Sequence, residues 1–374
     1  MKRLVLVGGG HSHVEVIRRI GQKPSVGLHV TLVSPQRYTA YSGMLPGLVA
    51  GHYDYAQCHI DLQALSAAAC IDWVPDAAVG LDLAKRTLHC ASGAILTYDV
   101  TSLDVGSAPP HDPAQTPVAT DIAVKPTESF LHWWESVRVH ARTHGLRILT
   151  VGGGAAGVEM TLAMQHHLRQ TGGHAQFSIA TMSSTILPEH AAGVRRRFER
   201  VLRERDVGVL VGARVMRLED RAAWLDSGAR IEADHLVWAL GPKAAGWPGR
   251  SGLATDDQGF VLVDRHLRSI SHPEIFAAGD IATLRDHPHP KSGVYAVRHG
   301  PPLAENLRRV LSGGTLLAYT PQRTALALIS TGDRYAVASW GGLAAQGRWV
   351  WRWKDRIDRA FMARYRPQAR AGTA

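Results

Sequence analysis

The sequence has little cysteine: Cys58, Cys70 and Cys90 are the only three among 374 residues. They form no CxxC or CxxxxC pair, so no disulfide framework is predicted, and an odd, unpaired set is typical of a reducing compartment. The 20 histidines are scattered along the chain. The adjacent pair His166-His167 has no HExxH pattern, so the sequence predicts no metal site.

Long hydrophobic runs are also missing. No run reaches the roughly 18 apolar residues that a membrane-spanning helix needs. The run Leu4–Val7 is too short for the core of a signal peptide, so we interpret it as a strand and expect a cytoplasmic protein. Hydrophobic residues make up 45% of the chain and charged residues 20%, a globular balance that argues against disorder. The net charge is +10, but the basic residues are dispersed and no nucleic-acid-binding motif is present, so no nucleic-acid partner is predicted.

The opening stretch, RLVLVGGGHSHVEVI, reads as a strand, a glycine-rich turn and the start of a helix. Hydrophobic periodicity predicts strands over residues 3–7 and 28–33, with a helix over 12–21 between them. This is one βαβ unit. A second strand–glycine turn–helix–strand pattern begins at LRILTVGGGAAGVEM. Two such units in one chain indicate two similar nucleotide-binding domains rather than a solenoid.

The two glycine turns differ in one position. In the fingerprint Gly-x-Gly-x-x-Gly, the first two glycines permit the turn and the approach of a pyrophosphate, and the third permits close helix packing. The first unit has Gly8 and Gly10, but His13 replaces the third glycine, which affects packing more than binding. The second unit carries the complete set: Gly152, Gly154 and Gly157.

Both units lack the acidic residue that is expected at the end of the second strand to bind a ribose. Ser34 follows the first of these strands, and Thr181 ends the second. A hydroxyl binds a ribose hydroxyl less strongly than a carboxylate does. No arginine directly follows Thr181, so the choice between NADH and NADPH stays open. The missing carboxylate weakens the prediction, based on the glycines, that the second unit binds a nucleotide.

Four motifs together resemble a known family. They are VLVGGGHSHVEV, TSLDVGS, TVGGGAAGVE and IFAAGDIA, in this order. The chain resembles the two-dinucleotide-domain flavoproteins of the pyridine nucleotide–disulfide oxidoreductase superfamily, and within it the type II NADH dehydrogenases and sulfide:quinone oxidoreductases. The segments YTAYSGMLPGLVAGHY, VKPTESFLHWWE and WRWKDRIDRAFMARY carry this narrower resemblance. A subgroup that is sometimes fused ahead of selenide, water dikinase is the most similar.

The resemblance implies an α/β fold of two Rossmann-like, glutathione-reductase-like domains with a short C-terminal segment. It implies FAD in residues 1–120 plus 252–320, NAD(P)H in residues 121–251, and a C-terminal segment over 321–374. The family's Gly-Asp dipeptide, here Gly279-Asp280, holds the ribityl–phosphate part of the flavin. The cofactor-binding residues implied in this way are Gly8, Gly9, Gly10, His11, Ser12, Ser34, Arg37, Ser42, Gly43, Val79, Gly106, Ser107, Gly279, Asp280, Val294, Gly152, Gly154 and Gly157.

Four residues are the catalytic candidates. His11 opens the first helix and would reach the flavin edge or an incoming anion. Lys125 would stabilise negative charge on reduced flavin, and Lys291 precedes a helix that would point at the flavin. Glu159 would lie near the junction of nicotinamide and flavin. Each of the four also has a purely structural interpretation, as a helix-terminal or surface polar residue.

The activity implied is the transfer of electrons from NAD(P)H through FAD to a quinone or similar small acceptor. The stretch 38–58, where related disulfide reductases carry a CxxxxC pair, contains only Cys58, so no redox-active disulfide takes part. Two alternatives stay open. One is flavin-dependent oxidation of sulfide, selenide or another small reductant. The other is a flavin-bound interaction module with a vestigial nucleotide domain.

The segment 348–366 combines tryptophan with positive charge. On a helix, an apolar stripe forms from Trp349, Trp353, Ile357, Ala360 and Phe361. Seven lysines and arginines against Asp355 and Asp358 leave a local excess of positive charge. Such a helix is typical of peripheral attachment to an anionic membrane surface, here the cytoplasmic face. Packing of the stripe on the protein's own body or on a second subunit, in a homodimer, is the alternative.

Overall fold

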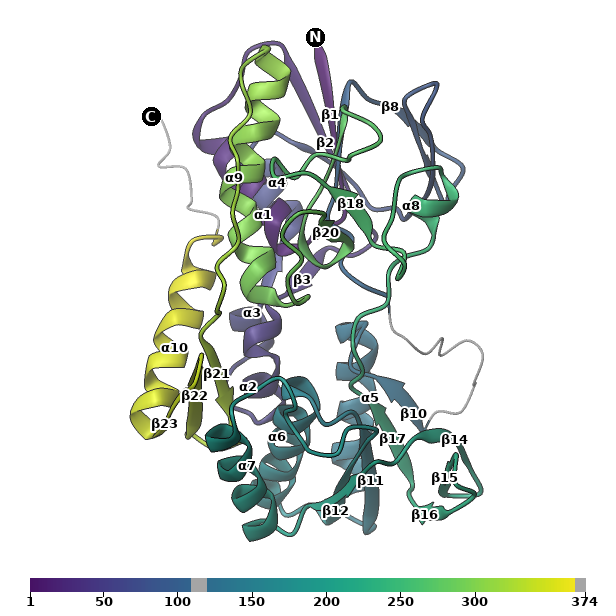
Figure 1. The fold of residues 1–374 in the computed structure, drawn as a ribbon, viewed down its shortest axis with the longest axis vertical. Coiled ribbons are helices and arrows are strands. Elements are labelled where there is room, and N and C mark those ends of the chain that lie inside the picture. Colours follow the sequence, from purple (N-terminus) through teal and green to yellow (C-terminus); the bar gives the residue numbers. More distant parts are fainter. Residues whose placement is uncertain (109–119, 367–374) are drawn as a thin grey trace.

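The computed structural model describes residues 1–108 and 120–366. Two α/β domains lie one above the other in Figure 1, and the C-terminal segment runs along one side of both. The upper domain holds a five-stranded sheet in the order β19-β9-β1-β2-β5, with every neighbouring pair parallel. Its strands are β1 (Lys2–Val7), β2 (Leu28–Val33), β5 (Asp72–Val74), β9 (Val100–Leu103) and β19 (Ile275–Ala277).

The lower domain repeats this plan. Its parallel sheet has the order β10-β17-β11-β12-β13, so β11 takes the central place that β1 has above. Its strands are β10 (Asp121–Ala123), β11 (Leu146–Val151), β12 (Ala175–Thr181), β13 (Gly208–Val211) and β17 (His235–Trp238). The central strands are buried because the helices pack on one face of the sheet, whereas residues of a small antiparallel sheet pack on the other. The predicted duplication of βαβ units is confirmed.

Each parallel sheet is accompanied by a small antiparallel sheet. Above, it consists of β6 (Ala78–Asp82), β7 (Thr87–Cys90) and β8 (Ile95–Thr97), and below of β14 (Val215–Glu219), β15 (Ala222–Leu225) and β16 (Arg230–Glu232). Two-stranded pairs complete the upper domain: β3 (Tyr38–Ala40) with β4 (His59–Asp61), and β18 (Val261–Val263) with β20 (Ala282–Leu284).

The helices follow the predicted pattern with shifted ends. The upper domain has α1 (His11–Gln22), η1 (Ser42–Met44), α3 (Tyr55–Cys58), α4 (Leu62–Ala68), α8 (Trp247–Arg250), η3 (Gly279–Ile281) and α9 (Gly293–Ser312). The short helix α2 (Leu45–Val49) comes between η1 and α3 in the chain, but it packs on α6 in the core of the lower domain. The lower has α5 (Thr127–His140), α6 (Ala155–Thr171) and α7 (Ala192–Glu204). The sequence predicts a helix over 127–144 with Thr127 as its N-cap. In the structure this helix ends at His140, where turns replace it before Gly145, and Pro126 is its N-cap. The sequence also predicts a basic helix over 189–206, and the observed helix, α7, is shorter.

Two crossover segments connect the domains, and these segments run side by side. Ala108 and Lys243 form an antiparallel bridge, with N···O distances of 2.8 and 3.2 Å. The sequence of each segment, TSLDVGSAPP and ADHLVWALGPKA, predicts a strand that leaves a sheet into a crossover. In the structure both segments do leave the carboxyl end of a strand, β9 and β17. The prolines at 109 and 110 in the first of them lie outside the described residues. The domain boundaries at 120, 251 and 320 remain a proposal.

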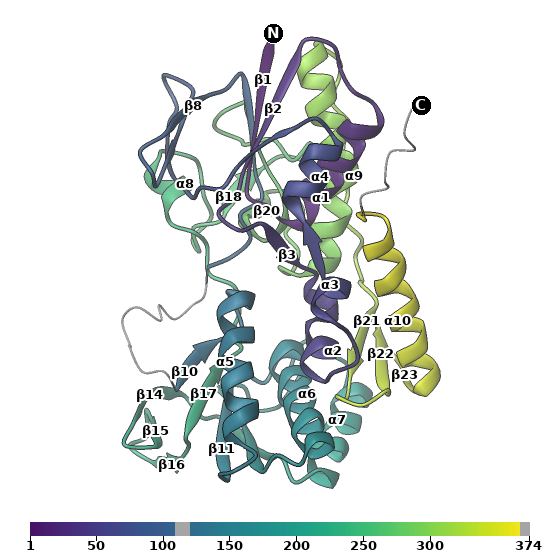
Figure 2. The ribbon, with the colours of Figure 1, turned by 180° about the vertical axis from the view of Figure 1, so that it is seen from behind.

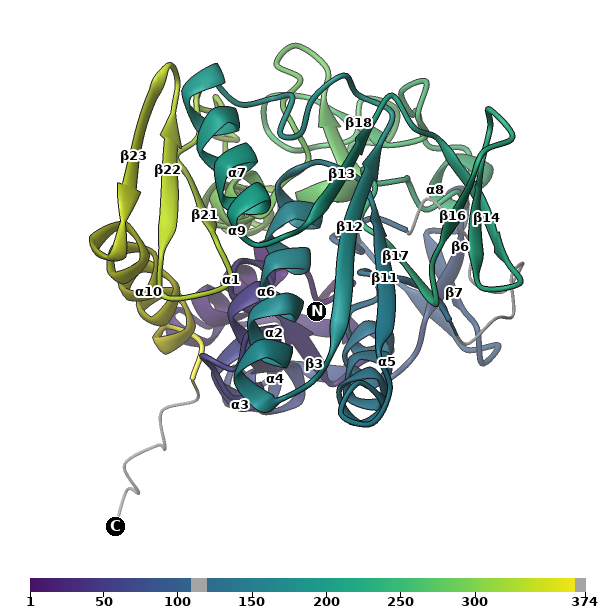
Figure 3. The same ribbon diagram turned by 90° about the horizontal axis from the view of Figure 1, so that it is seen from below.

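The C-terminal segment is not a separate tail. It forms the sheet β21 (Ala327–Ser330), β22 (Ala336–Trp340) and β23 (Leu343–Gly347), followed by α10 (Arg348–Ala363). Figures 2 and 3 show the sheet beside α7 and α10 on the outer side of the molecule. Ile329 and Val337 belong to the hydrophobic core of the lower domain, whereas Phe361 and Met362 belong to that of the upper domain. The segment therefore ties the two domains together.

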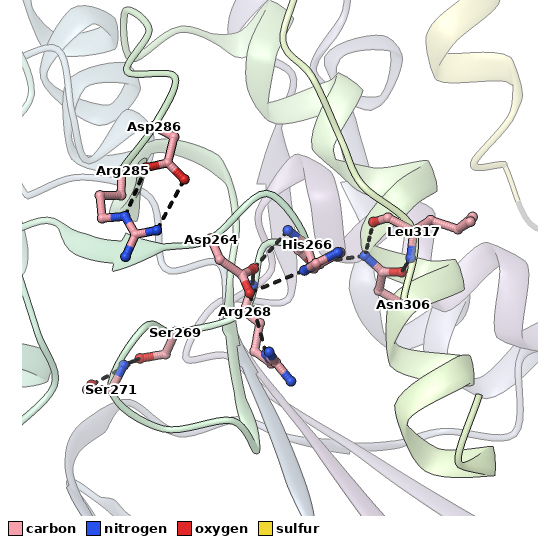
Figure 4. A network of polar contacts seen from close by, with 9 residues as sticks. All are labelled: Asp264, His266, Arg268, Ser269, Ser271, Arg285, Asp286, Asn306 and Leu317. Carbon is pink, nitrogen blue, oxygen red and sulfur yellow. Dashed lines mark hydrogen bonds and ion pairs between the residues drawn. The ribbon is translucent and has the colours of Figure 1, made fainter. Parts of the chain in front are cut away.

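A polar network holds α9 in place beside the first sheet (Figure 4). The carboxylate of Asp264 accepts hydrogen bonds from the backbone N–H groups of His266 and Arg268, at 2.8 and 3.1 Å. The side-chain amide of Asn306, in α9, donates to the carbonyl oxygens of His266 and Leu317 at 2.9 Å each. The loop after β18 thereby fixes the helix whose N-terminus faces the glycine turn of the upper domain.

Candidate functional site

The two glycine turns occupy equivalent places, each at the carboxyl end of a central strand. The φ angles of Gly8 and Gly152 are +93° and +127°, in the region that only glycine enters without strain. A Cβ atom at Gly8 would lie 2.4 Å from the carbonyl oxygen of Asp104, and one at Gly152 would lie 2.4 Å from that of Ala239. Asp104 and Ala239 follow β9 and β17, so they are counterparts in the two domains. Ligands of open α/β folds bind at this edge of the sheet.

His13 takes over the packing place of the missing third glycine. In the lower domain, a Cβ at Gly157 would lie 1.9 Å from the carbonyl oxygen of Gly152, so that position accepts only glycine. In the upper domain, the buried ring of His13 bonds to the Gly8 carbonyl oxygen at 2.7 Å and to the Ser102 hydroxyl at 2.8 Å. Burial lowers the pKa of His13 to about 4, so the ring is neutral near pH 7. The substitution therefore replaces close packing by two hydrogen bonds.

The N-terminus of α6 is open. Gly154 is its N-cap, and no side chain caps the helix. A Cβ at Gly154 would meet no atom within 4 Å, so the protein's own packing does not require glycine there. The free N–H groups and the helix dipole together suit an anion, and a pyrophosphate approaching the backbone accounts for the glycine. The lower domain thus fits a pyridine dinucleotide.

The N-terminus of α1 is different, because Asp104 fills it. Its Oδ2 accepts hydrogen bonds from the backbone N–H groups of Ser12 at 2.8 Å and His13 at 3.0 Å. A Cβ at Gly10 would lie 2.3 Å from Asp104 Oδ1. Sequence reasoning quoted the motif that contains Asp104 but did not select the residue. The available signal was an acidic residue directly after a buried strand.

A charged cluster lies beside this turn. Asp280, in η3, forms an ion pair with Lys125 at 3.1 Å, and the Lys125 ammonium lies 3.4 Å from the Ser107 hydroxyl. His11 is held neutral because burial lowers its pKa to about 4, against the opposing field of Asp280. The structure therefore brings together residues from four separate segments of the chain. Gly106 and Gly279, the glycines of two of these segments, both have positive φ angles, of +68° and +67°.

This cluster fits the flavin that the resemblance implies. A Cβ at Gly106 would meet no atom within 4 Å, so this turn leaves room for a ligand, and Asp280 presents a carboxylate suited to ribityl hydroxyls. Among the described residues, the buried Nε2 of His11 has no hydrogen-bond partner, and a bound cofactor would supply one. FAD would be held by the α1 turn, Ser107 and Asp280, and would supply the hydride and electron chemistry that the side chains lack.

Aromatic rings from α10 and from the segment after β3 form one wall of the site. The ring of Phe361 stacks on that of Tyr41 at 4.3 Å, and His11 meets Tyr41 edge-on at 5.5 Å. Lys354 donates to the carbonyl oxygen of Gly43 and, at 2.7 Å, to the carboxylate of Asp358. The inner face of α10 thus covers the turn that the sequence assigned to the flavin. Sequence reasoning missed this covering role.

The predicted exposed stripe on α10 is corrected by these contacts. Phe361 is only 4% exposed and faces the protein, so it does not belong to the outer stripe. Trp349, Trp353 and Ile357 do point outward, with exposed fractions of 56%, 42% and 42%. The reason is the helix phase: residues four apart are offset by about 40°, so the side-chain direction turns by about 120° between Trp349 and Phe361, and Phe361 packs on Tyr41.

Several other predicted cofactor residues lie around the edge of the site. Ser34 is buried beside Gly9, and its N–H donates to the carbonyl oxygen of Val74. Ser42 lies against Gly293, at the start of α9, and Val294 next to it is partly exposed. The remaining two lie further out. Arg37 is exposed and pairs with Asp61 at 2.6 Å, and Val79 is half exposed in β6.

Two catalytic candidates lie outside the charged cluster. Glu159, in α6, accepts a hydrogen bond from the N–H of Ser330 at 2.6 Å. Burial raises its pKa, against the opposing charge of Lys354, so it faces the C-terminal segment. Lys291 donates to the Thr283 hydroxyl at 2.7 Å and to a neighbouring carbonyl, and burial lowers its pKa to about 8. The negative charges of Asp256 and Asp280 oppose this lowering of the Lys291 pKa.

The described residues offer neither a metal site nor a membrane-spanning helix. Within residues 1–108 and 120–366, no group of three or more histidine, cysteine, aspartate or glutamate side chains is arranged to hold a metal ion. Over the same ranges, no helix is both long and apolar enough to cross a membrane.

Comparison with known proteins gives one family match. The family model described as pyridine nucleotide-disulphide oxidoreductase matches residues 2–300. The NADH dehydrogenase-like protein Rv1812c of Mycobacterium tuberculosis is 26% identical over 273 residues, which cover 67% of this chain and 64% of that protein. The chain thus matches somewhat less than two thirds of this relative's length.

Solved structures show the same architecture. The sulfide:quinone oxidoreductase of Aquifex aeolicus has a TM-score of 0.83 at 16% identity, covering 100% of this chain and 93% of that one. NDH2 of Plasmodium falciparum, in complex with NADH, has a TM-score of 0.78 at 14% identity, covering 97% of both chains. The predicted α/β fold of two dinucleotide-binding domains is confirmed. The narrower resemblance to the selenide, water dikinase fusion subgroup stays a prediction.

Proposed function

The chain belongs to the pyridine nucleotide-disulphide oxidoreductase family, and from this premise we propose that it passes electrons from NAD(P)H through FAD to a quinone or similar small acceptor. The observation that carries the proposal is the pair of glycine turns, one at the central strand of each Rossmann domain. The turn at Gly154 is open to a second dinucleotide, and the turn at Gly8 adjoins Asp280 and Lys125.

Transfer without a protein dithiol is part of the proposal. Cys58 is the one cysteine between residues 38 and 58, and it is buried. Burial raises the pKa of its thiol to about 12, so the reactive thiolate is disfavoured near neutral pH. This supports direct exchange between the two cofactors. It also argues against the alternative in which sulfide is oxidised through a cysteine relay.

The chain's own residues would orient the two cofactors, place charge beside them, exclude water and hold a proton. The N-terminus of α6 orients the dinucleotide through its pyrophosphate. Asp280 orients the flavin, while Lys125 keeps a positive charge beside it. Phe361 and Tyr41 exclude water from the side that α10 covers. Glu159, with its raised pKa, is suited to hold a proton at its carboxyl group on the side facing α10.

Anaerobic reduction of the purified protein tests this proposal. We expect a yellow protein that releases FAD on denaturation and whose flavin absorbance bleaches with NADH or NADPH and returns when a quinone is added. Bleaching by sulfide or selenide alone would favour oxidation of a small reductant. A flavin that no donor reduces would favour an interaction module with a vestigial nucleotide domain, which Ser34 and Thr181 also motivate.

We also propose that the protein attaches to the anionic cytoplasmic face of a membrane through the outer face of α10. Trp349 and Trp353 stack on this exposed face, with ring centroids 6.5 Å apart. Each nearby lysine or arginine contributes about 1 kcal/mol of attraction to anionic lipid. A quinone dissolves in lipid, so this location would bring the site close to its acceptor. The alternative occupant of this face is a second copy of the chain.

Replacing Trp349, Trp353 and Ile357 together by serine is expected to abolish co-sedimentation with anionic liposomes at low salt. The three side chains are exposed, so the fold should be kept, whereas deletion of α10 would also uncover Tyr41. Val139→Ser is the matched control, because Val139 is equally exposed but lies on α5, away from α10 (Figure 3). Equal pelleting of wild type and triple variant would contradict membrane attachment, and a dimer lost in the variant would favour the second copy.

A further inference from the structure

In the upper domain, the carboxyl group of Asp104 occupies the helix end at which Rossmann folds bind the pyrophosphate of a dinucleotide. In α1, Gly10 is the N-cap, so Ser12 and His13 supply the second and third N–H groups of the helix, and both donate to Asp104. In α6 the equivalent position after the strand is Ala239, and the corresponding groups have no side-chain cap. The internal duplication thus shows what the site looks like without the carboxylate.

The carboxyl group of Asp104 is enclosed. The residue is 2% exposed, and its oxygens lie against two glycines: a Cβ at Gly279 would be 2.2 Å from Oδ1, and a Cβ at Gly10 would be 2.3 Å from it. Within the described chain, no lysine or arginine forms an ion pair with Asp104. Desolvation disfavours the charged form of such an enclosed carboxyl group, whereas hydrogen bonds from the backbone of Ser12 and His13 and from the Ser12 side chain favour it.

The groups facing Asp104 come from several elements. Asp280, in η3, is the nearest negative charge and is paired with Lys125. His11 lies in the same first turn of α1 as Ser12 and His13, whose backbone N–H groups donate to Asp104. His299, in α9, accepts with its Nδ1 the N–H of Gly279 at 3.1 Å. Burial keeps all three histidines neutral, with pKa values of about 4, 4 and 3.

The balance of these effects favours a neutral Asp104. Burial, with a smaller contribution from Asp280, raises its pKa to about 7, against the two backbone hydrogen bonds. A pyrophosphate placed at the same helix end would add negative charge beside two carboxylates, with Lys125 as the neighbouring cation. Coulomb repulsion between the pyrophosphate and the two carboxylates then favours protonation of one of them. Asp104 is the carboxyl group that takes up a proton most readily.

We propose that Asp104 takes up a proton when FAD binds, so that its carboxyl group is neutral beside the pyrophosphate and pH sets the affinity for the cofactor. The inference rests on the proposed function, since it requires FAD in the upper domain. The sign follows from linkage: free protein above neutral pH carries the charged form and must first bind a proton. The dissociation constant for FAD therefore rises with pH, approaching about tenfold per pH unit on the alkaline side.

Rebinding of FAD to the full-length apoprotein between pH 6 and pH 9 tests the inference. Fluorescence quenching of FAD measures the dissociation constant, and calorimetry in buffers of different ionisation enthalpy counts the protons taken up. For wild type we expect weakening by about 100-fold across this range and net proton uptake near pH 8. Asp104→Asn keeps the hydrogen-bond acceptor but not the titration, so its affinity should stay nearly constant. Asp104→Ala, which resembles Ala239, should also lose the pH dependence.

Each of the other possible results of this experiment would overturn the inference, and one of them would also overturn the proposed function. The same pH dependence in wild type and Asp104→Asn would overturn the inference and point to Lys291, the other neighbour that titrates in this range. Zero proton uptake by wild type would overturn it even if neither variant folds. Failure of wild type to bind FAD at every pH would overturn the proposed function and this inference with it. Binding at constant affinity would overturn the inference alone.

Discussion

Gly154→Val is expected to abolish reduction of the flavin by NADH while leaving FAD bound. The Cβ position at Gly154 is open space in the protein, and its φ of −75° suits any residue, so the variant should fold. The branched side chain would occupy the space above the first turn of α6 that a pyrophosphate needs. We expect kcat/KM for NADH to fall by at least about 100-fold, which corresponds to roughly 2.7 kcal/mol of lost transition-state binding. Stopped-flow reduction measures this directly.

Gly145→Val is the matched control for this variant. Gly145 precedes the same strand, β11, at its opposite end, is exposed, and would also place its Cβ in open space. We expect it to be reduced at the wild-type rate. Undiminished reduction of the Gly154 variant would show that NADH does not bind at α6. A wild-type flavin that NADH never reduces would instead favour the alternative functions.

Asp280→Ala is expected to release FAD. The Asp280 side chain is 14% exposed and carries the carboxylate of the charged cluster. Hydrogen bonds to a charged group contribute about 1.5–3 kcal/mol each, so losing one or two of them should weaken FAD binding by about 100-fold or more. The variant also leaves Lys125 without its partner. The measurements are the ratio of flavin to protein absorbance after gel filtration and the dissociation constant on rebinding.

Asp264→Ala controls for a general loss of stability. Asp264 is also partly buried and holds two backbone N–H groups of its loop, but it belongs to the network of Figure 4. Its removal should lower the melting temperature without changing the intrinsic affinity for FAD. If Asp280→Ala retains flavin as wild type does, Asp280 has no role in holding the cofactor. If Asp280→Ala does lose flavin, the flavin content of Asp280→Asn shows whether the negative charge or the hydrogen bonding of Asp280 holds the cofactor.

The accuracy of the sequence predictions varied with the range of the interactions involved. The βαβ units were predicted because strand alternation and the turns at Gly8 and Gly152 are local properties of the chain. Helix ends were less accurate, as at His140, because turns and caps compete with the helix over one or two residues. The stripe on α10 was right for Trp349 but wrong for Phe361. Helical periodicity identifies an apolar residue, but it does not say which neighbour covers it.

The sequence by itself determined the duplicated α/β plan, the glycine positions that admit a pyrophosphate, and the lack of a redox-active dithiol. These follow from residue types and their spacing, which are the same in any fold. Only the tertiary structure decided that Asp104 reaches the first turn of α1. Parallel pairing of β1 and β9 brings together residues that are more than 90 positions apart. It likewise decided that α10 packs its inner face on Tyr41, because that contact depends on where the two domains place the end of the chain.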